Sequence, residues 1–551
     1  MKMKARTRRP STFWLVVLAL TVLGVALALL LTSCGGGGGS ASADPPAAQP
    51  TPLTASDVDE VVHAAVQSVN VPLVVAVTDR LGNILAIFCT NAPCAPTKGM
   101  GNFGTTPDSQ NLAVALARTA SYFSNSQAPL SSRTVRFISG IHFPPGVSFT
   151  ANAALYGIEN TNRGCGGAQP FNSALVPGID VANSTLINPG DPTLTGGVPG
   201  LGILTGKKNT NDSDPLSVNP GGVPIFKNGA LVGGVGVVAG SGVADADLNT
   251  AEYAAFVGSG GLAGLPDGIG VAGALAPPNV VFIDGIALPF VNQTSAPAGV
   301  SAGTFTGSYI FGPRAGVLPK SGYLLPPQAG SMLSANEVDG IVMNAVATAN
   351  VTRAVIRLPL GERARMMIAV ADLDGTLLAV YRMPDATVFS IDVAVTKARN
   401  VIWFSNPPGA VDLPGVPAGT AVTNRTISFG AQPLFPPGID GSGDGPFFNL
   451  YTNDTAVDPA GIPLHGCTQG SDPNSPQNQS GIVFFPGAVP LYRNAVIVGG
   501  LGVSGDGVEQ DDFVTNGGSA GFEAPTAIRA DQVFINGVRL PYLKFPRNPT
   551  K

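Results

Sequence analysis

The residue with the clearest chemistry in this sequence is a cysteine that follows a long apolar segment. Residues 2–9 contain five Lys and Arg residues, residues 13–31 are almost wholly apolar, and residues 31–34 read Leu-Thr-Ser-Cys. A basic head, an apolar core and small residues are typical of a secretory signal peptide, and the last four residues fit a bacterial lipobox. We therefore predict a signal peptide over 1–34 and a lipid thioether on Cys34. The alternative is an uncleaved membrane-spanning helix, because the apolar segment is long enough.

Lipidation at Cys34 would place the mature chain in the bacterial cell envelope, on the periplasmic or the outer-surface side. More than one acyl chain on this cysteine would anchor it stably, whereas a single chain binds a membrane only marginally. Residues 35–52 are rich in Gly, Ser, Ala and Pro and cannot bury enough apolar surface to fold. We expect them to form a flexible linker between the membrane and the folded part.

The four other cysteines are even in number, and export would expose them to an oxidising compartment. Cys89 and Cys94 flank a short turn, so we predict a disulfide that closes a small loop. Cys165 and Cys467 are far apart in the sequence, and we predict that they pair with each other; buried free thiols are the alternative. Three histidines and no CxxC motif argue against structural zinc. Carboxylates in the second insert could hold calcium, although their spacing does not match an EF-hand, so the metal is left open; they are Asp440, Asp444, Asp454 and Asp458.

The composition indicates a loop-rich globular protein. The chain contains 71 Gly and 49 Pro residues, and only 12% of its residues are charged. Its net charge of −5 offers no basic surface for nucleic acid, so we expect no nucleic-acid partner.

The most informative pattern is an internal repeat, because six short segments recur in the same order. They are Leu53–Asp59 with Leu333–Asp339, Val75–Asp79 with Ile368–Asp372, Phe123–Asn125 with Phe404–Asn406, Phe143–Gly146 with Phe435–Gly438, Gly233–Val237 with Gly499–Val503, and Val281–Gly285 with Val533–Gly537. We therefore predict two tandem copies, at 53–295 and 333–551, joined by a connector at 296–332.

Each copy has the same predicted order of elements. A helix comes first, with Ser56 or Asn336 where an N-cap would lie. An antiparallel hairpin, a second helix, a long Pro/Gly-rich insert and another hairpin follow. This order predicts an α+β fold in which helices pack on an antiparallel sheet in each copy.

The second copy resembles the GlcG/HbpS haem-binding family. The resemblance is carried by the stretches MMIAVADLDGTLLAVYRM, SIDVAVTKARN and AVPLYRNAVIVGGLGVSGDGVEQDD. The residues that match the family pattern are Asp372, Gly375, Asp392, Lys397, Ala398, the segment Gly499–Gly505, Gln510 and Asp511. The first copy departs from this pattern, with Asn111 at the place of Asp392 and Leu116 at the place of Lys397. The resemblance implies a GlcG/HbpS-like fold for both copies, with the first one degenerate, and a dimer-like pairing within the chain.

The resemblance also implies haem or a related tetrapyrrole as cofactor, held by the second copy. The candidate binding residues are Tyr381, Arg382, Met383, Asp392 and Lys397. Tyr and Met can ligate haem iron, and Arg and Lys can pair with its propionates. The alternative is that these residues belong to a hairpin end and a solvated helix face.

No histidine is shared by the two copies, which leaves the axial ligand open. His63, His142 and His465 are each candidates, and each has an equally ordinary interpretation as a packing or loop residue. The function that the resemblance implies is tetrapyrrole binding by an exported lipoprotein. The alternative is a non-catalytic envelope scaffold or assembly protein without a cofactor, and catalysis is the least favoured class because the copies share no polar site.

Overall fold

The computed structural model describes helices and strands between Pro50 and Lys551. The described residues are 50–100, 108–140, 143, 155, 158, 220–242, 244–261, 264–265, 269–270, 281–407, 412–439, 441–452 and 482–551. The signal segment, Cys34, Cys165, Cys467, His142 and His465 lie outside them. Among the described helices, none combines the length and apolar character that a membrane span requires.

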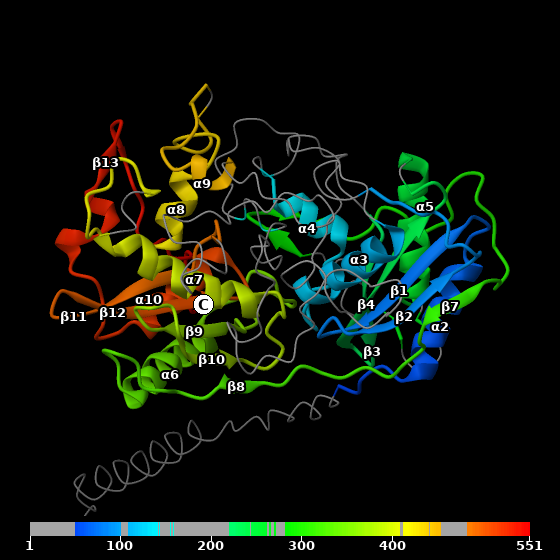
Figure 1. The fold of residues 1–551 in the computed structure, drawn as a ribbon, viewed down its shortest axis with the longest axis horizontal. Coiled ribbons are helices and arrows are strands. Elements are labelled where there is room, and N and C mark those ends of the chain that lie inside the picture. The colour runs from blue at the N-terminus through cyan, green and yellow to red at the C-terminus, as the bar shows by residue number, and fades with distance from the viewer. Residues whose placement is uncertain are drawn as a thin grey trace, which may run out of the picture. The chain divides into compact units, whose positions relative to one another are not determined.

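The N-terminal half contains the first of two five-stranded sheets (Figure 1). Its helices are α2 (Ala55–Gln67), α3 (Ser109–Phe123), α4 (Ser132–Ile138) and α5 (Asp245–Gly258). Its strands are β1 (Leu73–Asp79), β2 (Ile84–Cys89), β3 (Gly222–Lys227), β4 (Ala230–Ala239), β5 (Phe282–Ile283), β6 (Ile286–Ala287) and β7 (Ser308–Phe311).

The C-terminal half contains the second sheet. Its helices are α6 (Ala335–Val351), α7 (Ser390–Ser405), α8 (Asn424–Gly430), α9 (Asn449–Thr452) and α10 (Val508–Gly518), with 3₁₀ turns η6 (Thr526–Ile528) and η7 (Ala530–Gln532). Its strands are β8 (Gly322–Leu325), β9 (Met367–Ala371), β10 (Leu377–Arg382), β11 (Ala488–Arg493), β12 (Val496–Ser504), β13 (Phe534–Ile535) and β14 (Val538–Arg539).

The two sheets have the same strand order. The first is β3-β4-β1-β2-β7 and the second is β11-β12-β9-β10-β8, with every neighbouring pair antiparallel. Mixed helix and antiparallel sheet therefore form the fold, as the pattern of elements predicts. The predicted connector at 296–332 has a larger role than joining, since it supplies β7 to the first sheet and β8 to the second.

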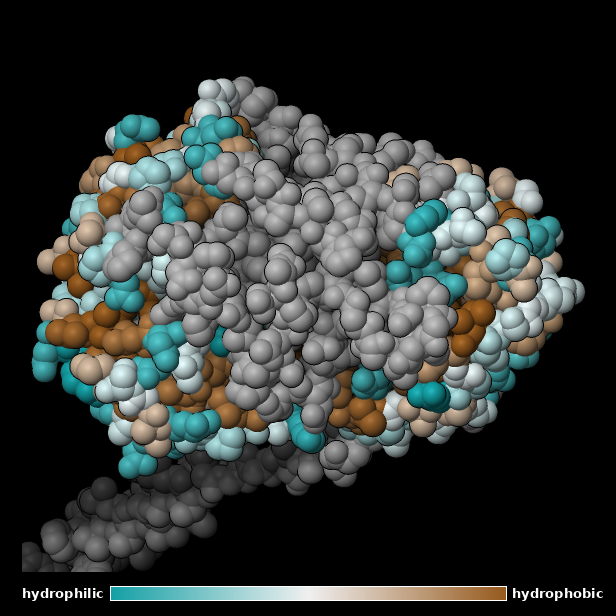
Figure 2. Space-filling view, viewed as in Figure 1, coloured by the Kyte–Doolittle hydropathy of each residue, from teal (hydrophilic) through white to brown (hydrophobic). Residues whose placement is uncertain are grey.

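Alternation along the strands explains why helices cover both faces of each sheet. Val75 and Val77 of β1 pack with α2 and α5, whereas Val74 and Ala76 of the same strand pack with α3. Successive side chains of a strand point to opposite faces, so a strand that is apolar at every position needs cover on both. On the face drawn in Figure 2, hydrophilic and apolar residues are interspersed over the described parts.

The N-cap of the first helix in each half lies two residues before the predicted one. Thr54 caps α2 and Ser334 caps α6, in place of Ser56 and Asn336. The hydroxyl of Thr54 accepts from the backbone N–H of Asp57, and the Asp57 carboxylate accepts from the N–H of Thr54. This reciprocal capping box satisfies two N–H groups that a helix start leaves unpaired, which explains the earlier start.

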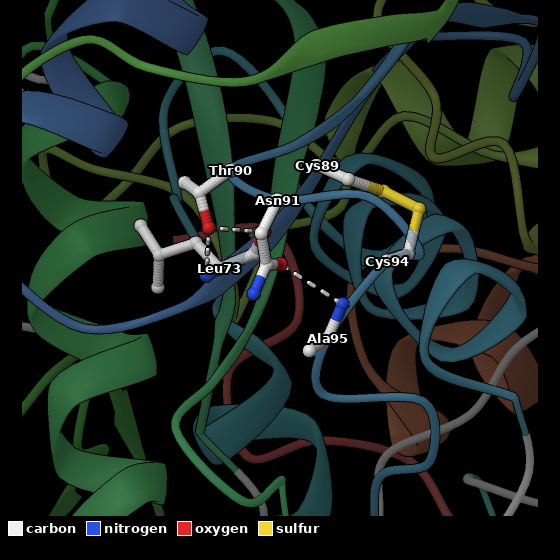
Figure 3. Close-up of a disulfide and its surroundings, with 6 residues drawn as sticks. All are labelled: Leu73, Cys89, Thr90, Asn91, Cys94 and Ala95. Atoms are coloured by element: carbon white, nitrogen blue, oxygen red, sulfur yellow. Dashed lines mark hydrogen bonds between the residues drawn. A yellow bond between two sulfur atoms is a disulfide. The ribbon is translucent and has the colours of Figure 1, made fainter.

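The predicted disulfide between Cys89 and Cys94 is confirmed (Figure 3). It closes a small loop directly after β2, at the end of the first sheet where β1 begins. Thr90 Oγ1 in this loop accepts from the Leu73 N–H over 2.8 Å, and Asn91 Oδ1 accepts from the Ala95 N–H over 3.1 Å. The loop is therefore attached to the sheet by hydrogen bonds as well as by its own bridge.

Candidate functional site

Buried arginines hold the β-hairpin turn in both halves. Arg118 Nε of α3 donates to the Gly82 carbonyl over 2.8 Å, and Arg399 Nε of α7 donates to the Gly375 carbonyl over the same distance. Burial lowers the pKa of both guanidinium groups, to about 10 for Arg399. These contacts are made at matching places of the two sheets, so they position the turns and leave neither arginine as a ligand-binding group.

One buried position differs between the halves. Lys397 Nζ donates to Asp511 Oδ2 and to the Val503 carbonyl, both at 2.9 Å, and lies 4.7 Å from the centre of the Phe485 ring. The position of a Cβ on Gly487 would be within 2.8 Å of both Lys397 and Asp511. The corresponding contacts of Gly221 in the first half are with Leu116 and Ala251, which are apolar. An ion pair in one half therefore replaces an apolar pair in the other.

The electrostatics of this pair follow from its burial. Desolvation raises the pKa of Asp511 to about 7, against the opposing effect of Lys397, and desolvation lowers the pKa of Lys397. Both groups lose hydration on burial, and their mutual contact replaces part of it, together with the Val503 carbonyl for Lys397.

The halves meet through opposite ends of their sheets, across a network centred on Asp385. Arg80, just after β1, lies 2.8 Å from Asp385 Oδ1, and Arg357 lies 2.7 Å from its Oδ2. Ser126 Oγ donates to the same carboxylate over 2.8 Å, and Arg357 Nε contacts Asp506 at 2.5 Å. The ring of Phe123 stacks on Phe389 with centroids 4.2 Å apart, so both halves share one apolar core at this junction.

A pocket lies at the same junction. Both halves contribute to its lining, which consists of Ile138, Phe143, Leu155, Ile283, Asp284, Val355, Ile356, Gly507, Val508, Glu509 and Gln510. Mostly apolar walls with a few polar groups are typical of small-molecule sites. Among the described residues, this pocket is our candidate binding site.

None of the five predicted ligand residues lines this pocket. Arg382 is buried and donates to the Lys320 and Ala386 carbonyls, and Met383 Sδ accepts from the Met366 N–H over 3.4 Å. Tyr381 packs edge-on against Tyr323, 4.9 Å between centroids. Desolvation, and then the nearby charge of Arg80, lowers the pKa of Arg382 to about 9, against the opposing effect of Asp385.

The two α7 residues of the prediction are also buried. Asp392 lies in the first turn of α7, and Lys397 has no exposed surface, so the interpretation of this helix as solvated is wrong. Every residue of α7 is buried because the second sheet and the covering loops enclose it. His63 is half-buried, and its ring stacks on the ring of Phe305 with centroids 3.4 Å apart. Its Nε2 lies 3.6 Å from Asp59 Oδ2, and it is not among the residues that line the pocket.

The described residues that line the pocket do not form a site that could coordinate haem iron. It contains no His, Met, Tyr or Cys to coordinate iron, and no Lys or Arg to pair with propionates. Among the described residues, no group of three or more His, Cys, Asp or Glu side chains is placed to hold a metal ion. What the pocket does offer is a mostly apolar lining.

Sequence reasoning missed most of the pocket. Val355 and Ile356 lie in the loop between α6 and β9, which is longer than the corresponding loop between α2 and β1. No sequence motif includes these two residues. Two signals were present in the sequence: Ile283-Asp284 belongs to a repeated segment, and Glu509-Gln510 belongs to the stretch that resembles GlcG/HbpS proteins. Neither signal says that the two segments meet.

Comparison with known proteins places a family match in the C-terminal half. The family model described as haem degrading protein HbpS-like matches residues 343–519, less than half of the chain. The corrinoid adenosyltransferase PduO of Salmonella typhimurium is 27% identical over 160 residues, which are 29% of this chain. The match spans 33% of that enzyme's own length.

Two solved structures are similar over 36% of the chain. A PduOC–haem complex is 22% identical with a TM-score of 0.22, covering 99% of that chain. Klebsiella pneumoniae protein ORFY is 18% identical with a TM-score of 0.22, covering 95% of that chain. Residues 343–519 of this protein form one HbpS-like domain.

Proposed function

We propose that this chain is an exported lipoprotein that binds haem or a related tetrapyrrole at the cell envelope. The observation that carries the proposal is the HbpS-like match over 343–519, which includes Gly507–Gln510 of the pocket. The mostly apolar lining of the junction pocket supports an apolar ligand there.

We further propose that the chain is a tandem duplication whose copies pair within one molecule. The identical strand order of the two sheets supports this. So do Arg118 and Arg399, which donate to equivalent hairpin glycines. The first copy then contributes Ile138, Phe143 and Ile283 as one wall of the pocket, although it lacks the family pattern in its own sequence.

The direct test is to titrate a soluble form of the protein, residues 35–551 without the lipidated cysteine, with haemin and with metal-free protoporphyrin. We expect a saturable Soret shift with one ring per chain. Alanine variants of His63, His142 and His465 then report whether a histidine coordinates the iron, since loss of an axial ligand changes the haemin spectrum. The whole chain is needed because the halves share a core. If neither porphyrin binds, tetrapyrrole binding is wrong.

Export and lipidation have a separate test. Cys34→Ala should prevent lipid attachment, and the protein should move from the membrane fraction to the soluble fraction or remain as an unprocessed precursor. Mass spectrometry of the N-terminus and detergent phase partitioning distinguish these outcomes. Cys165→Ala is the matched control and should leave the protein in the membrane fraction. A Cys34→Ala protein that is cleaved and anchored like the wild type would contradict the lipoprotein proposal.

One observation favours the second candidate, a scaffold without cofactor. Two of the polar residues that carry the family resemblance, Lys397 and Asp511, form a buried ion pair with each other and do not face the pocket. If the protein is such a scaffold, the porphyrin titrations give no Soret shift, and the pocket is only imperfect packing between the two halves.

A further inference from the structure

A short hairpin that follows α6 lies beside the end of the chain. The backbones of Arg353 and Arg363 pair as an antiparallel bridge in this hairpin. The Arg353 N–H donates to the Pro549 carbonyl over 2.6 Å, and Arg363 Nη1 donates to the Thr550 carbonyl over 3.3 Å. Two segments that are far apart in the sequence therefore form one surface.

This surface, which we call the basic patch, is made by 351–365 and 547–551. Its cations are Arg353, Arg363, Arg365, Arg547 and Lys551. Among the described residues, no carboxylate forms an ion pair with any of these five, whereas Arg357 of the same hairpin is buried in the junction network. Glu362 is the one acidic residue of the two segments, in a chain whose net charge is −5. Positive charge is thus concentrated here against the overall balance.

Helix capping explains part of this charge. Arg363 Nη1 donates to the Val351 carbonyl at the end of α6 over 3.0 Å, and cations stabilise a helix C-terminus, where the last carbonyls are unpaired. Arg547 and Lys551 are different, because they are exposed and their side chains make no hydrogen bond with any described residue. Capping of α6 therefore does not account for these two cations.

The basic patch also exposes large aliphatic side chains. Leu360, near the tip of the hairpin, is 77% exposed, the most of any large apolar residue in the described part of the chain, and Val351 is 50% exposed. The hairpin is fixed from beneath, because Arg357 pairs with Asp385 and Asp506. A loop that is anchored in this way presents its leucine to the solvent beside the cations.

We propose that the basic patch docks on a membrane surface that contains anionic phospholipids. Guanidinium groups pair with phosphate in a bidentate geometry, and each Lys or Arg close to an anionic bilayer adds to the affinity. Aliphatic side chains beside such cations enter the boundary between head groups and acyl chains. Nucleic acid is a poorer partner, because the chain is negative overall. The inference depends neither on tetrapyrrole binding nor on the anchor at Cys34, since it requires no acyl chain.

The test is co-sedimentation of the soluble form, residues 35–551 without the lipidated cysteine, with lipid vesicles. One set of vesicles contains phosphatidylglycerol and phosphatidylcholine, and the other contains phosphatidylcholine alone. We expect saturable binding to the first set only. Raising the salt concentration from about 0.1 M to about 1 M should abolish this binding, because it shortens the screening length from about 10 Å to about 3 Å.

Variants of the exposed residues locate the contact. Arg547→Gln/Lys551→Gln should weaken binding to the anionic vesicles about twentyfold, at about fivefold for each cation. Leu360→Ser should weaken it about fivefold by removing an aliphatic side chain that enters the bilayer. Both variants should unfold at the same urea concentration as the wild type, because the altered side chains are exposed.

The matched control is Arg314→Gln/Arg539→Gln, which removes the same charge from two exposed arginines outside the basic patch. It should change binding by less than about twofold. Equal binding to both sets of vesicles, or an equal loss in the control and patch variants, would overturn the inference, because general adsorption would explain the binding. Patch variants that bind like the wild type would also overturn it and leave the patch to an acidic protein partner. The haemin titration uses no vesicles, so its result is independent of these outcomes.

Discussion

Lys397→Leu is expected to lower the free energy of unfolding by about 3–5 kcal/mol, the cost of removing one partner of a buried ion pair. The change leaves the Asp511 carboxylate without its cation in a site where its side chain is only 3% exposed. The Val503 carbonyl also loses the N–H that it accepts from. Urea unfolding followed by circular dichroism measures the loss.

The double variant Lys397→Leu/Asp511→Ala should recover most of that stability. The first half already has apolar residues at the corresponding place, where Leu116 and Ala251 lie around Gly221. Replacing a buried ion pair by packed apolar residues is often neutral or stabilising. If the double variant is as unstable as the single one, the two sites are not equivalent and this explanation is wrong.

The single variant should also depend on pH. The pKa of Asp511 is already raised to about 7 by burial, and removing Lys397 takes away a group that lowers it. A carboxyl whose folded pKa is above its unfolded value favours the folded state when it is protonated, and this stability is lost as pH rises through the folded pKa. Lys397→Leu should therefore be least unstable near pH 5 and most unstable near pH 8, and a loss that is the same at both would contradict the assignment.

Asp385→Ala is expected to cost about 2–4 kcal/mol, somewhat below the full value for a buried pair because the side chain is 24% exposed. It leaves Arg80 and Arg357 facing each other at the junction and removes the acceptor of Ser126. The loss should extend to ligand binding, because Ile356, next to Arg357, lines the pocket. Unfolding curves and porphyrin titrations on the same preparation measure both.

The control for this variant is Asp339→Ala. Asp339 is exposed and accepts a single hydrogen bond from Tyr323, so its loss should stay within about 0.5 kcal/mol. A result in which both variants cost the same would mean that the junction network adds nothing.

The network also predicts how the junction responds to acid. The Arg80 and Arg357 guanidinium groups hold the pKa of Asp385 well below its usual range, against the effect of burial. A depressed folded pKa stabilises the protein above the unfolded pKa of about 3.9, and that contribution disappears as pH falls toward the folded value. The wild type should thus lose stability below about pH 4 more steeply than Asp385→Asn.

The sequence by itself determined those features that depend on neighbours along the chain. The recurring segments predict two similar halves because turns such as Asp284-Gly285 and Asn536-Gly537 need residues that accept positive φ. Short apolar runs separated by turn residues predict the hairpins, and the close spacing of Cys89 and Cys94 predicts their bridge. The match of 343–519 to an HbpS-like family agrees with the motifs at Asp372 and Gly499–Gly505.

The tertiary structure alone decided which residues meet across long distances in the sequence. Lys397 is indistinguishable in sequence from a solvated helix lysine, and only the sheet, Asp511 and Phe485 around it make it a buried cation. The edge strands β7 and β8 come from a segment with no strong strand pattern, and pairing with β2 and β10 defines them. The pocket exists because two halves meet end to end, and periodicity along one chain contains no information about which ends of two sheets will dock.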